Sequence, residues 1–103
     1  MKSDSEALQD IGQLLKRSRK TLGLTQEQVA DMAGLSRPRY REIEAGCSAA
    51  RTTTLINIGR ALGLELLLIP QAMVPAVEAL LQPGGAEDDL PAFVASPDGD
   101  GNV

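Results

Sequence analysis

Three arginines and a glutamate lie within the six residues 37–42. If this segment is an α-helix, Tyr40 and Ile43 fall on one side, at 100° per residue, and must be buried. The opposite side then presents four residues: Arg37, Pro38, Arg41 and Glu42. An arginine can hydrogen-bond O6 and N7 of guanine, and a glutamate can accept from the cytosine amino group. We therefore predict that this side contacts base edges, and that Arg39, on the flank, contacts a phosphate.

Two short helices joined by a tight turn would position these side chains. Thr25 with Gln28 three residues later forms a capping box, and Ser36 is a second N-cap, with a proline tolerated in the first turn after it. Between them, Gly34 supplies the left-handed conformation that ends the first helix. Two helices joined so closely form a helix-turn-helix unit, whose second helix lies in the major groove of DNA.

Phosphate contacts are expected around this unit. The positive N-terminus of the first helix makes Gln26 a candidate, and the remaining candidates are Ser36, Arg51 and Arg19. The same charges could form an ordinary solvated helix face. Thr52 and Thr53, which follow Arg51, could also contact a phosphate, but helix capping explains both equally well. The paired caps, the glycine turn and the clustered arginines favour DNA binding.

The segments TQEQVA, AGLSR and REIEAG resemble the Cro/repressor-type (XRE-like) helix-turn-helix family, and the resemblance covers residues 6–64. It implies a domain of four or five helices, a contact between Gln26 and the DNA backbone, and an ion pair between Arg19 and Glu44. The chain departs from the family at Pro38-Arg39-Tyr40, where many members carry small residues and an aliphatic side chain.

The net charge of −4 conceals an asymmetric distribution. Residues 16–60 contain nine basic and four acidic side chains, whereas residues 61–103 contain seven acidic side chains and no basic one. A basic module followed by an acidic remainder is compatible with DNA binding. With one cysteine and no histidine, the chain offers no disulfide framework, metal site or nucleophile with a base. We expect a cytoplasmic protein without cofactor or enzymatic activity, and no membrane span or signal peptide.

Residues 1–63 are expected to form an all-α helix-turn-helix domain, with outer helices at 6–21 and 52–62. The apolar run 64–69, between a glycine and Pro70, favours a strand over another helical turn. Because the chain has no second strand signature, this strand must pair with the same strand of a second copy, which gives a homodimer. The two recognition helices of such a dimer would read a palindromic DNA site. The dimerisation residues would be Leu64, Leu66, Leu67, Leu68 and Ile69.

A domain of this type followed by such a strand resembles the HipB-like antitoxins. The resemblance implies a repressor that controls its own operon and neutralises a HipA-like kinase toxin. A stand-alone, phage-type regulator is the alternative, and a protein-interaction module that has lost DNA binding is a third interpretation. Residues 71–82 would form a short helix within a dimerisation region, 64–82. The acidic tail, 83–103, is expected to be disordered, with Leu90 and Phe93 as candidate docking residues for a partner or simply as part of a solvated tail.

Overall fold

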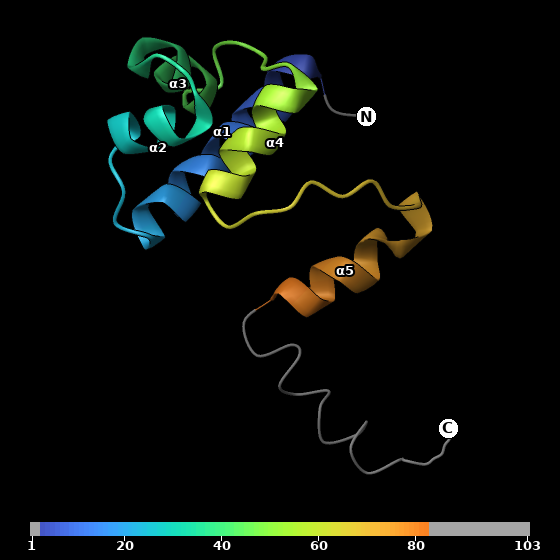
Figure 1. Ribbon diagram of the computed structural model, residues 1–103. Coiled ribbons are helices and arrows are strands. Elements are labelled where there is room, and N and C mark those ends of the chain that lie inside the picture. Colours follow the sequence, from blue (N-terminus) through green and yellow to red (C-terminus); the bar gives the residue numbers. More distant parts are fainter. Residues whose placement is uncertain (1–2, 83–103) are drawn as a thin grey trace. The chain divides into compact units, whose positions relative to one another are not determined.

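The computed structural model describes residues 3–82, which belong to two units, one ending at Leu66 and the other beginning at Leu67. The first unit is a bundle of four helices: α1 (Asp4–Thr21), α2 (Gln26–Ala33), α3 (Arg37–Glu44) and α4 (Thr52–Ala61) (Figure 1). In the second unit, a 3-10 turn (Gln71–Met73) leads into α5 (Val74–Leu81). The prediction of an all-α helix-turn-helix bundle is confirmed.

The helix starts follow short-range capping signals. Thr25 and Gln28 form the predicted capping box, with Gln28 N–H donating to Thr25 Oγ1 at 3.0 Å. The Ser36 hydroxyl accepts from the backbone N–H of Arg39 at 3.2 Å, as predicted for an N-cap. The sequence interpretation missed a further capping box, in which Ser3 and Glu6 begin α1 two residues earlier than expected. Capping was one of two interpretations of Thr52 and Thr53, and in the structure Arg51 is the N-cap of α4, without a side-chain hydrogen bond.

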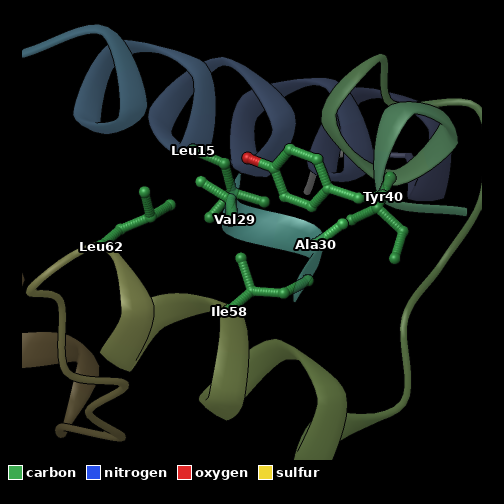
Figure 2. Packing of buried hydrophobic residues seen from close by; sticks show 7 residues of the cluster. Leu15, Val29, Ala30, Tyr40, Ile58 and Leu62 are labelled. Atoms are coloured by element: carbon green, nitrogen blue, oxygen red, sulfur yellow. The ribbon is translucent and has the colours of Figure 1, made fainter. Parts of the chain in front are cut away.

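The core of the bundle is aliphatic apart from one tyrosine. Every helix of the first unit contributes to it, and the side chains converge between α1, α2 and α4 (Figure 2). The buried residues are Leu15, Val29, Ala30, Tyr40, Ile43, Ile58 and Leu62. Burying a side chain of this size stabilises the fold by roughly 1.5–3 kcal/mol, so these residues fix how the four helices pack. Tyr40 and Ile43 lie on the buried side of α3, as predicted.

Two glycines allow α1 and α3 to approach closely. A Cβ atom at Gly12 would overlap the carbonyl oxygen of Glu44 at the end of α3. A Cβ atom at Gly46, just after α3, would lie 2.9 Å from Cα of Gln9. Gly46 also has a φ of +76°, which disfavours any side chain at this position. These contacts determine how closely α3 packs against α1.

The apolar segment after α4 is neither helix nor strand in the single chain. Leu64 packs against the core, and its N–H donates to the carbonyl of Gly59 at 2.7 Å. Leu66 helps to line an apolar hollow with Ile11 and Leu14. The first compact unit extends to Leu66. Pairing of 64–69 between two copies stays a prediction, because it is a property of two chains.

The rest of the described chain is short. The predicted helix 71–82 is present as the 3-10 turn and α5, with Pro75 in the first turn of α5. Within residues 3–82, none of the helices combines the length and the apolar character needed to cross a membrane. The predicted acidic tail, with Leu90 and Phe93, lies outside the described residues.

Candidate nucleic-acid interface

The turn between α2 and α3 has the predicted geometry. Gly34 adopts a left-handed conformation with φ of +74°, and the N–H of Leu35 donates to the carbonyl of Ala30 at 2.8 Å. Ser36 then begins α3 directly. The four side chains predicted to face bases, Arg37, Pro38, Arg41 and Glu42, are all exposed. The structure therefore presents them on the side of α3 that points away from the core.

Glu44, on the last turn of α3, is the one charged side chain that the bundle buries within the described residues. Its side chain is 4% exposed. Arg19 Nε donates to Oε1 at 2.7 Å and Arg19 Nη2 donates to Oε2 at 3.1 Å. Gln26 Nε2 donates to Oε2 at 2.8 Å, and the Tyr40 hydroxyl donates to Oε1 at 2.9 Å. We refer to Arg19, Gln26, Tyr40 and Glu44 as the Glu44 cluster.

The charges of this cluster stabilise each other. Burial alone would raise the pKa of the Glu44 carboxyl, but hydrogen bonds from Arg19, Gln26 and Tyr40 outweigh it and hold that pKa below its ordinary value. The hydrogen bond to Glu44 raises the pKa of Arg19. Burial, together with the hydrogen bond to Glu44, raises the pKa of Tyr40 far above its ordinary value. The ion pair therefore stays charged and the tyrosine neutral at pH 7.

The Glu44 cluster joins three helices at the base of α3. The ion pair between Arg19 and Glu44 that the family resemblance implied is present. Arg19 Nη1 also donates to the carbonyl of Leu24 at 3.0 Å, in the turn before α2. The guanidinium is thus bound inside the protein, which favours a positioning role for Arg19 over the predicted phosphate contact. Sequence reasoning missed the bond from Tyr40, although the i,i+4 spacing of Tyr40 and Glu44 could have indicated it.

Gln26 stands at the first turn of α2 beside an open hollow of about 380 Å³. Its amide nitrogen donates to the carboxylate of Glu44, and this hydrogen bond fixes the orientation of the side chain. Arg37, at the start of α3, lines the same hollow. The structure therefore brings together a predicted phosphate contact and a predicted base contact. The backbone N–H groups at the start of α2 add the positive end of a helix dipole.

The two other predicted phosphate contacts from basic side chains differ in their surroundings. Arg51 is exposed at the N-terminus of α4. Arg39 instead donates to the hydroxyl of Ser48 and the carbonyl of Ala49, at 2.6 and 2.8 Å, in the loop after α3. Sequence reasoning missed this pair of bonds, and no local spacing signals them. Ser36 uses its hydroxyl as the N-cap of α3.

Within residues 3–82, six exposed cationic side chains form no ion pair with another described residue. They are Lys16, Arg17, Lys20, Arg37, Arg41 and Arg51. Exposed cations of this kind are the side chains that pair with the phosphates of a polyanion.

Four helices with an exposed, arginine-bearing third helix after a glycine turn define the helix-turn-helix class of protein. The helix-turn-helix family model matches residues 15–69, and the chain belongs to that family. An uncharacterized HTH-type transcriptional regulator, y4dL, of Sinorhizobium fredii (strain NBRC 101917 / NGR234) is 29% identical over 80 residues, covering 78% of this chain and 41% of the relative. YqaE of Bacillus subtilis (strain 168), with the same description, is 42% identical over 52 residues, covering 50% of this chain and 45% of the relative. The chain thus spans less than half the length of either relative.

Proposed function

We propose that this protein is a sequence-specific, double-stranded-DNA-binding transcription regulator that acts as a repressor. The observation that carries the proposal is the exposed, arginine-bearing side of α3, which the buried Glu44 cluster holds at a fixed angle on the bundle. Family membership and the description of both relatives as transcriptional regulators support it. In this proposal Arg37, Pro38, Arg41 and Glu42 contact bases, whereas Gln26, Ser36 and Arg51 contact the backbone.

A homodimer fits this function because two recognition helices would read a palindromic site. The support lies in the surface around the apolar segment 64–69. Leu67 is 70% exposed and Leu68 is 96% exposed, next along the chain to the apolar hollow that Leu66 lines. Exposed leucines in the one unit and an apolar hollow in the other, each taken by itself, favour association with a second copy.

For the finer role we propose an antitoxin that represses its own operon and neutralises a HipA-like kinase toxin. The support is the resemblance of the domain and its leucine-rich segment to HipB-like antitoxins. A stand-alone, phage-type regulator is the alternative. Co-purification with a kinase encoded beside the protein, lost when residues 71–103 are deleted, would favour the antitoxin. Binding to operator DNA without any such kinase would favour the stand-alone regulator.

The test of DNA binding is a titration of the full chain against a duplex that carries the sequence upstream of its own gene. We expect binding that weakens steeply with salt, because phosphate contacts release counterions. Replacing Arg41 by Ala should weaken binding by about 1–3 kcal/mol and relax the preference at one base position.

Arg60→Ala is the matched control, since Arg60 lies on α4 and faces Glu65 at 3.9 Å. It removes the same charge and should leave the sequence preference unchanged. If Arg41→Ala weakened binding equally on every sequence, Arg41 would belong to the phosphate contacts. Salt-independent binding, or no preference for the upstream duplex, would contradict the proposed function.

A further inference from the structure

The guanidinium of Arg39 fastens the first turn of α3 to the loop that connects α3 with α4. Nη1 donates to Ser48 Oγ at 2.6 Å and Nη2 donates to the carbonyl oxygen of Ala49 at 2.8 Å. A carboxylate oxygen of Glu42 lies 3.7 Å from Nη1. A planar guanidinium can make two directed bonds of this kind at once, whereas a lysine ammonium cannot reproduce the geometry.

The same loop is tied to the other end of α3 by backbone bonds. The N–H of Gly46 donates to the carbonyl of Ile43 at 3.1 Å, and the N–H of Cys47 donates to the carbonyl of Glu42 at 3.0 Å. Two residues after the atoms that Arg39 holds, Arg51 begins α4 as an N-cap without a side-chain hydrogen bond. The backbone bonds fix where the loop leaves α3, and Arg39 fixes where it returns toward Arg51.

We propose that Arg39 is a positioning residue for DNA recognition rather than a phosphate contact. Its bonds to Ser48 and Ala49 set the place of Arg51 relative to the base-reading side of α3, so that both meet one duplex. The two bonds hold the guanidinium on the loop, so the loop rather than a phosphate sets the position of this side chain. This inference rests on the proposed function, because it assigns Arg39 a part in the same interface.

The experiment compares charge-conserving and charge-removing variants of the full chain on the upstream duplex. Arg39→Lys retains the positive charge but loses the two directed bonds, Arg39→Ala loses both, and Ser48→Ala removes one acceptor. Arg17→Lys is the matched control, since Arg17 is an exposed cation on α1 that forms no ion pair with another described residue. Hydrogen exchange of the backbone amides of residues 47–51, measured without DNA, reports the loop directly.

We expect Arg39→Lys to weaken DNA binding about as much as Arg39→Ala, by about three- to ten-fold, while Arg17→Lys binds as the wild type does. Ser48→Ala should cause part of this loss and none when added to Arg39→Lys. Arg51→Ala should cost less affinity in the Arg39→Lys background than alone, which a role in overall stability would not produce. Amide exchange in 47–51 should be faster in Arg39→Lys and Ser48→Ala.

The opposite results would overturn the inference. An Arg39→Lys variant that binds DNA like the wild type, with Ser48→Ala silent, would make Arg39 a phosphate contact, because a lysine can also serve a phosphate. If no form of the protein bound the upstream duplex, the proposed function would fail instead. Even in that case, unchanged amide exchange of residues 47–51 in Arg39→Lys would disprove that the hydrogen bonds of Arg39 order the loop.

Discussion

Glu44 shows how one residue can determine the orientation of a whole helix on the bundle. The carboxylate is buried and receives hydrogen bonds from α1, α2 and its own helix. Burying a charge is costly unless it is paired and hydrogen-bonded, and here several donors satisfy it together. Loss of the charge would leave Arg19 without its partner in a half-buried site. The angle of α3, and with it the direction of its arginines, depends on this residue.

Replacing Glu44 by Gln should therefore lower the free energy of unfolding at pH 7, by about 2–4 kcal/mol. Because folding lowers the pKa of Glu44, the ionised carboxyl contributes stability to the wild type that is fully present above the ordinary value of 4.5 and is lost as the pH falls through the folded value. The difference between the two proteins should narrow in acid. Urea unfolding between pH 7 and pH 3 would measure it, and a difference that stayed constant with pH would disprove the role of the ionised carboxyl. Glu42→Gln, on the exposed side of the same helix, is the control.

At the scale of elements, the contact between α1 and α3 decides how far the recognition helix stands out from the bundle. Gly12 lies directly beneath the end of α3, where a side chain would meet the backbone of Glu44. The same approach brings Arg19, two turns further along α1, within reach of the Glu44 carboxylate. Close packing of the two helices and the ion pair are thus one feature of the fold.

Gly12→Ala should consequently destabilise the bundle, by about 1–3 kcal/mol, because α1 and α3 must move apart. Gly59→Ala is a matched control in α4, since its Cβ would lie 3.5 Å from the nearest atom, an ordinary contact. There the gain in helix propensity should stabilise the protein, by up to about 1 kcal/mol. Urea unfolding should give opposite signs for the two variants. Equal effects would show that α1 and α3 do not pack as closely as described.

At the scale of the whole molecule, Leu67 and Leu68 after α4 bear on how two copies would associate, because both are exposed. Neighbouring exposed leucines of this kind are typical of a surface that associates with another molecule. A dimer through this segment would also raise affinity for a palindromic site, because the second domain binds at a high effective concentration.

Leu68→Lys should accordingly give a monomer in sedimentation equilibrium and weaken binding to a palindromic duplex, by about a hundred-fold. Leu22→Lys places the same charge at another exposed leucine and should leave the dimer intact. A wild-type protein that sediments as a monomer at the concentrations of the DNA titration would contradict the proposed dimer.

Local signals in the amino-acid sequence determined the elements of this protein. The predictions of the N-caps Thr25 and Ser36, of the left-handed Gly34 and of the two faces of α3 are all confirmed. Each of them depends on residues within four positions of each other. The Arg19–Glu44 pair was found only through the family resemblance. The early start of α1 at Ser3 had a local signal that was overlooked.

Only the tertiary structure decided which polar side chains remain available to a ligand. In the sequence, Arg39 cannot be distinguished from Arg37 and Arg41. Its guanidinium nevertheless donates hydrogen bonds to residues nine and ten positions further along the chain, in the loop after α3. Gln26 donates a hydrogen bond to Glu44, which lies eighteen positions later in the sequence. Such contacts depend on the packing of whole helices, set in part by Gly12 and Gly46, and helical periodicity carries no information about the distance between two helices.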